Sequence, residues 1–129
     1  MKECSVENPL SYLESSFVVM PVDANHYGNV HGGVIMLYCD NLAYAVASKF
    51  SHMNVVTAKV SELNFLKPVK IGDLVIIKGS LIRVGNSSME IKLCISGEHL
   101  LSGEVFDVAE ALFTMIAVDE SGRPKKIRR

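Results

Sequence analysis

Asp40 is the only charged residue of the stretch NVHGGVIMLYCDNLAYAVAS, residues 29–48, which otherwise has the composition of a buried segment. An unpaired carboxylate in a protein interior costs several kcal/mol even after the protein relaxes around it. Either the chain turns outward at Asp40, or the carboxylate lies where chemistry is done. A carboxylate in such a place could act as a general base on water or as a nucleophile.

Two further groups precede Asp40 in the chain. Asn25 lies in a polar loop, residues 21–31, and an HGG motif at residues 31–33 opens the apolar stretch. Backbone N–H groups of glycines at a helix N-terminus can approach a ligand closely and favour negative charge, including a developing oxyanion. A glycine pair entering a helix is more often a packing or turn device, so the motif alone leaves both interpretations open. Eight residues from Gly32 to Asp40 correspond to roughly 12 Å along a helix, which separates the two groups within one chain.

Hydrophobic patterning predicts the elements that position these residues. The Ala, Leu and Met content and the length of residues 33–50 favour a helix that is apolar around almost its whole circumference, and hence a central helix wrapped by other structure. Met36, Leu37, Tyr44 and Phe50 are assigned to its core side, with the alternative that one or two of them line a tunnel for a ligand. Strand-forming composition and alternation predict strands at residues 11–20, 54–66, 73–84, 87–96 and 104–118, with a hairpin turn at Gly85-Asn86.

The expected architecture is a single α+β domain, in which an antiparallel sheet wraps around one long helix in the order β-α-β-β-β-β. Residues 1–10 would be an N-terminal extension, residues 11–120 the domain and residues 121–129 a basic C-terminal tail. The open edges of such a sheet are commonly protected by dimerisation, so we expect a homo-oligomer.

Composition narrows the class of protein. With 129 residues, 49% hydrophobic and 21% charged, the chain is an ordinary globular domain. It shows no secretory signal and no apolar run of the ~20 residues that a membrane span needs. Three widely spaced cysteines fit neither a disulfide framework nor a zinc site, so reduced thiols in a cytoplasmic protein are the simplest interpretation.

Two segments, DANHYGNVHGGVIMLYCDNLAYAVASK and VVTAKVSELNFLKPVKIGDLVIIKGSLIRVGNSSMEI, resemble the acyl-CoA hydrolase branch of the hotdog-fold thioesterases. The resemblance covers about residues 12–118. Its specific part combines N-x-x-G-x-x-H-G-G, an Asp eight residues after the first Gly of the HGG motif, and the K-P-V-x-x-G-D link at residues 67–73.

The resemblance implies a hotdog homodimer, often assembled into a trimer of dimers or a tetramer, that hydrolyses fatty acyl-CoA to free fatty acid and CoA without a cofactor. Asp40 matches the catalytic carboxylate of the family and Asn25 its partner at the reacting centre. The backbone N–H of Gly32 or Gly33 matches the group that polarises the thioester carbonyl. In this family the Asn and the Asp come from different subunits, so the helix start of one subunit would face Asp40 of the other.

The segment RVGNSS, residues 83–88, resembles the family's strand-turn-strand beside the pantetheine and phosphates of CoA. Arg can pair with phosphate and Ser hydroxyls can donate to it, although an ordinary polar hairpin would have the same composition. The residues assigned to substrate and CoA binding are His31, Arg83, Gly85, Ser87 and Ser88. His31 is interpreted as a hydrogen-bonding residue at the helix entry rather than a base. The four histidines are scattered, so no metal site is expected.

Two rival functions remain to be weighed. A non-catalytic regulator that binds acyl-CoA or lipid could use the same fold, but it would not require both Asn25 and Asp40. The tail RPKKIRR, residues 123–129, could suggest nucleic-acid binding, yet the rest of the chain is acidic and has no aromatic-basic face. We expect the tail to be a solvated, mobile end, with phosphate binding as the alternative.

Overall fold

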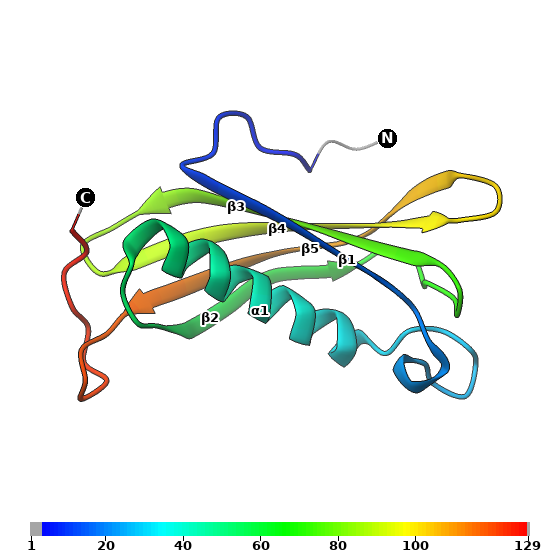
Figure 1. Ribbon diagram of the computed structural model, residues 1–129, viewed down its shortest axis with the longest axis horizontal. Helices are drawn as coiled ribbons and strands as arrows, with labels where there is room; N and C mark the ends of the chain where they lie inside the picture. Colours follow the sequence, from blue (N-terminus) through cyan, green and yellow to red (C-terminus); the bar gives the residue numbers. More distant parts are fainter. Residues whose placement is uncertain (1–3, 129) are drawn as a thin grey trace.

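The structure, a computed structural model, describes residues 4–128 as one sheet and one long helix (Figure 1). The elements in chain order are β1 (Ser11–Val18), a short 3-10 helix η1 (Pro21–Asp23), α1 (Gly32–Ser51), β2 (Val55–Phe65), β3 (Leu74–Val84), β4 (Ser88–His99) and β5 (Glu104–Ala117). The predicted α+β class and the order β-α-β-β-β-β are confirmed. The largest difference in bounds is at β4, which continues to His99 instead of ending at residue 96.

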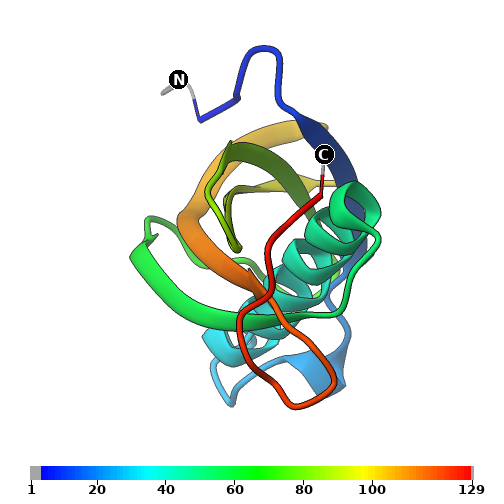
Figure 2. The same ribbon diagram turned by 90° about the vertical axis from the view of Figure 1, so that its left-hand side faces the viewer.

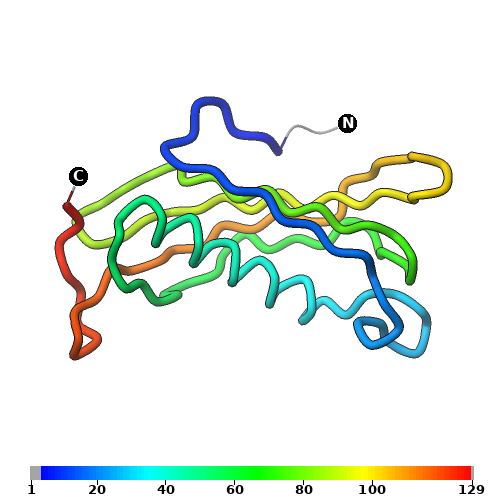
Figure 3. The backbone as a smooth tube through the Cα atoms, in the orientation of Figure 1, coloured from blue at the N-terminus to red at the C-terminus, as the bar shows by residue number. Residues whose placement is uncertain are grey.

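The sheet has the strand order β1-β3-β4-β5-β2, and every neighbouring pair is antiparallel. The hairpins β3–β4 and β4–β5 form its centre, whereas β1 and β2 are its two edges. Viewed from the end, the sheet curves around α1 (Figure 2), and the backbone trace shows α1 lying obliquely across the strands (Figure 3). This curvature gives the sheet an inner face against α1 and an outer face away from it.

Helix α1 buries a regular stripe against the inner face. Its buried residues recur at the three- and four-residue spacing of one helix face; they are Ile35, Cys39, Leu42, Ala43, Val46, Ala47 and Ser51. The helix packs closely on β3 at Gly79, where an added Cβ would lie 3.2 Å from Leu42. Tyr38 stacks on Phe17 of β1 with ring centroids 4.1 Å apart. Among residues 4–128, no helix combines the length and the apolarity that crossing a lipid bilayer requires.

The opposite side of α1 is open, which corrects the expectation of a wrapped helix. Leu37 and Tyr44, which were assigned to the core, are 59% and 48% exposed. The sheet covers only one side of the helix, so Leu37 and Tyr44 face outward in the single chain, whereas Met36 and Phe50 are half-buried and pack against the core. Periodicity shows that a helix is apolar all round, but it does not show which surface buries each side.

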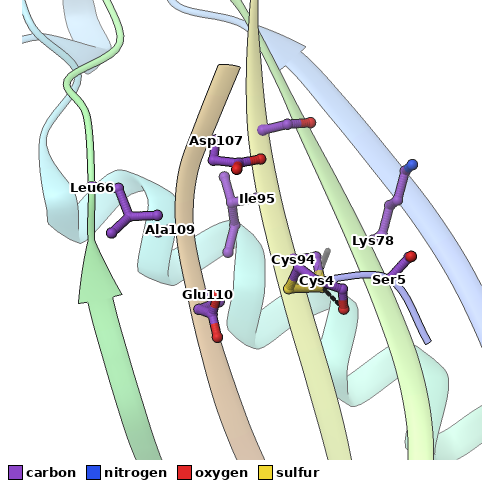
Figure 4. A pocket seen from close by; sticks show the side chains of 10 residues that line it. Cys4, Ser5, Leu66, Lys78, Cys94, Ile95, Asp107, Ala109 and Glu110 are labelled. Carbon is purple, nitrogen blue, oxygen red and sulfur yellow. Dashed lines mark hydrogen bonds between the residues drawn. A yellow bond between two sulfur atoms is a disulfide. The ribbon is translucent and has the colours of Figure 1, made fainter. Parts of the chain in front are cut away.

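The outer face carries the N-terminal segment, which a disulfide between Cys4 and Cys94 holds against β4 (Figure 4). The prediction of three reduced thiols is therefore wrong for these two cysteines, and a cytoplasmic location loses that support. The two residues are 90 positions apart in sequence, so only folding of the extension over the sheet reveals that they meet. Cys39 is free and buried.

The C-terminal tail is also held against the sheet. The basic side chains among residues 123–128 are exposed, as expected of a solvated end, but Ile127 is only 5% exposed. The Ile127 N–H donates to the carbonyl oxygen of Asn86 at 2.9 Å. The expectation of a mobile end is therefore wrong for the backbone, because one buried isoleucine among five basic residues and a proline anchors the segment.

Candidate active site

Asn25 organises the loop that precedes α1. Its side-chain oxygen accepts hydrogen bonds from the backbone N–H groups of Tyr27 at 2.9 Å and Asn29 at 3.2 Å. Such Asx turns are a common use of Asn in loops. Gly28, with a φ of 82°, allows the chain to reverse its direction between Tyr27 and Asn29. Within residues 4–128 the amide nitrogen of Asn25 has no hydrogen-bond acceptor, so it remains available to donate to a ligand.

The N-terminus of α1 lies next to this loop. His31 occupies the N-cap position, but its side chain makes no capping hydrogen bond. Its backbone carbonyl accepts hydrogen bonds from the N–H groups of Val34 and Ile35. The N–H groups of Gly32 and Gly33 have no acceptor in the described part of the chain. The first N–H groups of any helix lack intrahelical partners and carry partial positive charge. The helix therefore presents two donors suited to a carbonyl oxygen that gains negative charge.

A cavity of about 370 Å³ joins the loop and the helix start. Asn25, Asn29 and Gly32 line it on one side, and the segment from Phe65 to Val69 lines it on the other. The Asn29 side-chain oxygen is buried there without a hydrogen-bond partner. The Phe65 ring would lie 3.4 Å from a Cβ at position 32, so a glycine at this position keeps the cavity open between ring and helix.

Asp40 lies farther along α1 and does not line this cavity. Its carboxylate accepts a hydrogen bond of 2.6 Å from the Thr57 hydroxyl on β2. The Thr57 hydroxyl also lies 3.4 Å from the sulfur of Met115. Asp40 is half-buried at the border between the buried and the exposed side of α1, so its carboxylate is oriented by Thr57 and still accessible. This resolves the problem of an unpaired buried charge.

The neighbouring Cys39 is buried, and its thiol is unreactive at neutral pH. Burial, and secondarily the negative charge of Asp40, raise the pKa of the Cys39 thiol to about 12. A thiol in this state is protonated at neutral pH, and the thiolate is the nucleophilic form. Cys39 is therefore a core residue.

The residues assigned to CoA binding lie at the other end of the fold. Gly85 and Ser87 lie in the turn between β3 and β4, Ser88 begins β4, and Arg83 is exposed opposite Glu90 on the outer face. This turn lies near the end of α1 (Figure 1), whereas Asn25 and Gly32 line the cavity at its beginning. Within one chain the predicted site residues thus form three separate groups: Asn25 with Gly32, Gly33 and His31; Asp40; and Arg83 with Gly85, Ser87 and Ser88.

Sequence reasoning missed Thr57 and Phe65. Thr57 is the one hydroxyl side chain in the run VVTAKV, and a polar residue on the inner face of a strand is a signal that could have identified it. Phe65 ends β2 and gave no signal, because its contact with the helix start depends on how the edge strand curves.

Comparison with known proteins places this fold in a family. A family model described as the thioesterase superfamily matches residues 27–102. An uncharacterised acyl-CoA thioester hydrolase of Haemophilus influenzae is 38% identical over 115 residues, which are 87% of this chain and 75% of that protein. Another from Bacillus subtilis is 34% identical over 86% of this chain, which spans only 64% of that relative.

Solved structures agree with these sequence matches. A hexameric acyl-CoA thioesterase superposes with a TM-score of 0.86 at 34% identity, covering 90% of this chain and 74% of the other. An acyl-CoA hydrolase from Staphylococcus aureus, solved with butyryl coenzyme A and coenzyme A, superposes with a TM-score of 0.83 at 31% identity, covering 90% and 71%. Further structures of that hydrolase carry Ala in place of an Asp, a Thr or an Asn. The chain therefore belongs to the thioesterase superfamily, with the hotdog fold of the acyl-CoA thioesterases.

Proposed function

We propose that this protein hydrolyses the thioester bond of fatty acyl-CoA, giving the free fatty acid and CoA. The observation that carries the proposal is the arrangement around α1. An accessible carboxylate, Asp40, is held by Thr57, and the same helix begins with two unpaired N–H donors beside Asn25. These are the two parts that thioester hydrolysis needs, a base or nucleophile and a site for the oxyanion.

The chemistry follows from these groups. The N–H groups of Gly32 and Gly33 and the Asn25 amide bind the thioester oxygen and stabilise the negative charge that develops on it, which contributes about 3–4 kcal/mol in measured oxyanion holes. The Asp40 carboxylate removes a proton from water as the water attacks, or attacks the carbonyl itself to give an anhydride that water then cleaves. In both routes the C–S bond breaks, and the thiolate leaves and is protonated to the CoA thiol.

The two halves of this site lie apart in one chain, so the proposal includes a homodimer. Eight residues of helix separate Gly32 from Asp40, roughly 12 Å at ~1.5 Å per residue, too far for both to reach one thioester carbon. The exposed side of α1 and the unpaired edge of β2 offer an apolar surface for a second copy. In the proposed dimer, Gly32 of one subunit faces Asp40 of the partner subunit, and two equivalent sites form. The hexameric relative is consistent with further assembly of dimers.

The Staphylococcus aureus variants support the choice of residues. The replaced Asn, Asp and Thr of that hydrolase are separated by 15 and 17 residues along its chain. Asn25, Asp40 and Thr57 have the same two separations in this chain. The agreement of residue types and spacing makes Thr57 part of the proposed site, as the residue that positions Asp40.

The test is thiol release from acyl-CoA substrates of increasing chain length, measured for wild type and for Asp40→Asn. Asn keeps an acceptor for the Thr57 hydroxyl but loses the base, so we expect kcat to fall by about 10²–10⁴-fold. Thr57→Val should lower kcat by about tenfold through the lost hydrogen bond to a charged group, and Thr57→Ser should restore it. Glu7→Gln, which neutralises an exposed carboxylate of the N-terminal segment, is the matched control and should not change the rate.

Two outcomes would contradict the proposal. Wild-type rates in Asp40→Asn would remove Asp40 from the mechanism. A wild-type protein that binds acyl-CoA but releases no thiol from any chain length would replace hydrolysis with the alternative, a non-catalytic acyl-CoA-binding regulator.

A further inference from the structure

Asn29 lies in the loop that precedes α1, where its main chain and its side chain have separate roles. The Asn29 N–H donates to the Asn25 side-chain oxygen at 3.2 Å, and the Asn29 carbonyl oxygen accepts from the Asn25 N–H at 2.8 Å. Asn29 also forms an isolated bridge with Lys70. Main-chain groups of Asn29 make all of these contacts, so the loop does not require an amide side chain at this position.

The side-chain oxygen of Asn29 is buried in the cavity at the start of α1 and has no hydrogen-bond partner among residues 4–128. Most of the other residues that line the cavity are apolar; they are Val30, Ile35, Phe65, Leu66, Pro68 and Val69. The ammonium group of Lys67, which also lines the cavity, lies over the Phe106 ring at 5.8 Å from its centroid. Burying a polar atom without a hydrogen bond costs free energy. The position of the Asn29 oxygen therefore indicates that a ligand supplies the missing donor.

The same cavity contains the groups proposed to bind the thioester oxygen. Asn25 and Gly32 line it together with Asn29, and Gly32 follows Asn29 by three residues. An amide oxygen is an acceptor, so it cannot bind the oxyanion and must pair with an N–H or O–H group. In fatty acyl-CoA the donor nearest to the reacting carbon is the cysteamine amide N–H, two carbons beyond the sulfur.

We propose that the Asn29 side-chain oxygen accepts a hydrogen bond from this cysteamine amide N–H and thereby places the thioester carbonyl beside Asn25 and Gly32. The proposal rests on the proposed function and makes Asn29 a residue that selects thioesters by the atoms next to the sulfur. The amide does not change during the reaction, so the hydrogen bond contributes equally to the bound substrate and to the transition state. Its loss should therefore raise KM and leave kcat unchanged.

The test uses Asn29→Leu, which removes the acceptor and keeps the approximate size of the side chain. Asn29→Ala removes the same acceptor without adding apolar surface. Asn54→Leu is the matched control, because Asn54 is exposed and does not line this cavity.

The substrates separate the amide from the rest of CoA. Hexanoyl-CoA and the hexanoyl thioester of N-acetylcysteamine contain the amide N–H, whereas S-propyl hexanethioate does not. Thiol release gives KM and kcat for all three. Calorimetry gives Kd for S-hexyl-CoA, a thioether that contains the amide but no bond that the protein could hydrolyse.

We expect both Asn29 variants to raise KM for the two amide-containing substrates, and Kd for S-hexyl-CoA, by about tenfold, because the ligand N–H loses its acceptor. The values of kcat, and KM for S-propyl hexanethioate, should stay within about twofold of wild type, as should all values for the control.

Unchanged KM and Kd values in the Asn29 variants would overturn the proposal. An equal fall of kcat for substrates with and without the amide would also overturn it, because Asn29 would then act on the attacking water and not on the cysteamine amide. If wild type binds S-hexyl-CoA but hydrolyses none of the thioesters, the proposed function fails, while the Kd comparison still decides on Asn29.

Discussion

Strands β4 and β2 have similar lengths and both are rich in apolar residues, yet they are buried in opposite ways. Along β4 buried and half-buried residues alternate strictly until its last residue. Along β2 only Val55 is buried, and nearly all other residues are exposed. The difference comes from position, because β4 is the central strand and β2 an edge. Apolar composition thus shows that a strand is to be buried, but not whether its own chain buries it.

The same division runs along α1. Cys39 belongs to the stripe buried against the sheet, whereas Leu37 and Tyr44 face outward with β2. Asp40 lies at the border and takes its hydrogen bond from β2. The proposed chemistry is therefore located at the boundary between the side of α1 that packs on its own sheet and the exposed side that the proposed dimer would cover.

The largest effect is expected from a charge on the inner face of β2. Val60 is 38% exposed and pairs with Phe113 of β5. We expect Val60→Asp to dissociate the proposed dimer. Acyl-CoA hydrolysis should then fall to background, because the two halves of the site separate. Light scattering measures the dissociation of the dimer, and thiol release from acyl-CoA measures the loss of hydrolysis. Ile82, 39% exposed on β3, gives the matched control Ile82→Asp, which should keep dimer and activity. A dimeric, active Val60→Asp protein would show that β2 is not the interface.

A cavity in the centre of the sheet should affect stability instead of assembly. Ile91 of β4 is fully buried, so Ile91→Ala should lower the free energy of unfolding by about 2–5 kcal/mol. Val56→Ala, at an exposed position of β2, should lower it by less than about 1 kcal/mol. Urea unfolding of both variants measures the difference. Equal losses would mean that the two strands are not buried as differently as their exposure indicates.

The smallest effect concerns the pH dependence of stability through Cys39. The folded protein holds the pKa of this thiol at about 12, above the ordinary value of 9.0. Between these values the unfolded chain loses the proton and the folded chain keeps it, so stability falls as pH rises above 9. From pH 9 to pH 10 the contribution is about 1 kcal/mol. Urea unfolding of wild type and Cys39→Ala at both pH values tests this, because the variant should lack that part of the slope. Identical slopes would contradict the assignment.

Much of the fold was predictable because it depends on local pattern. The alternation in β3 and β4 and the turn at Gly85-Asn86 follow from side-chain period and turn chemistry, which act over a few residues. Asp40 was recognisable as a candidate because a lone carboxylate in an apolar helix needs an explanation. The proposal that Asp40 of one subunit faces Asn25 and the glycine pair of the other comes from the family resemblance and not from the geometry of the single chain.

The remaining features depend on contacts between distant residues. The Thr57 hydroxyl reaches Asp40 only because β2 packs beside α1, and the exposure of Leu37 and Tyr44 depends on how far the sheet curves. The Cys4–Cys94 bond and the burial of Ile127 arise where terminal segments fold back on the sheet. No local pattern encodes such contacts, so the sequence predicts some of these features wrongly and does not indicate the others.

The disulfide between Cys4 and Cys94 has a practical consequence for handling the protein. It fixes the start of the described chain on the outer face of the sheet, away from α1 and β2. An affinity tag, dye or solid support attached ahead of Cys4 would therefore project from the side that the proposed catalysis does not use. Immobilisation through the N-terminus is thus the orientation that leaves the proposed active site accessible.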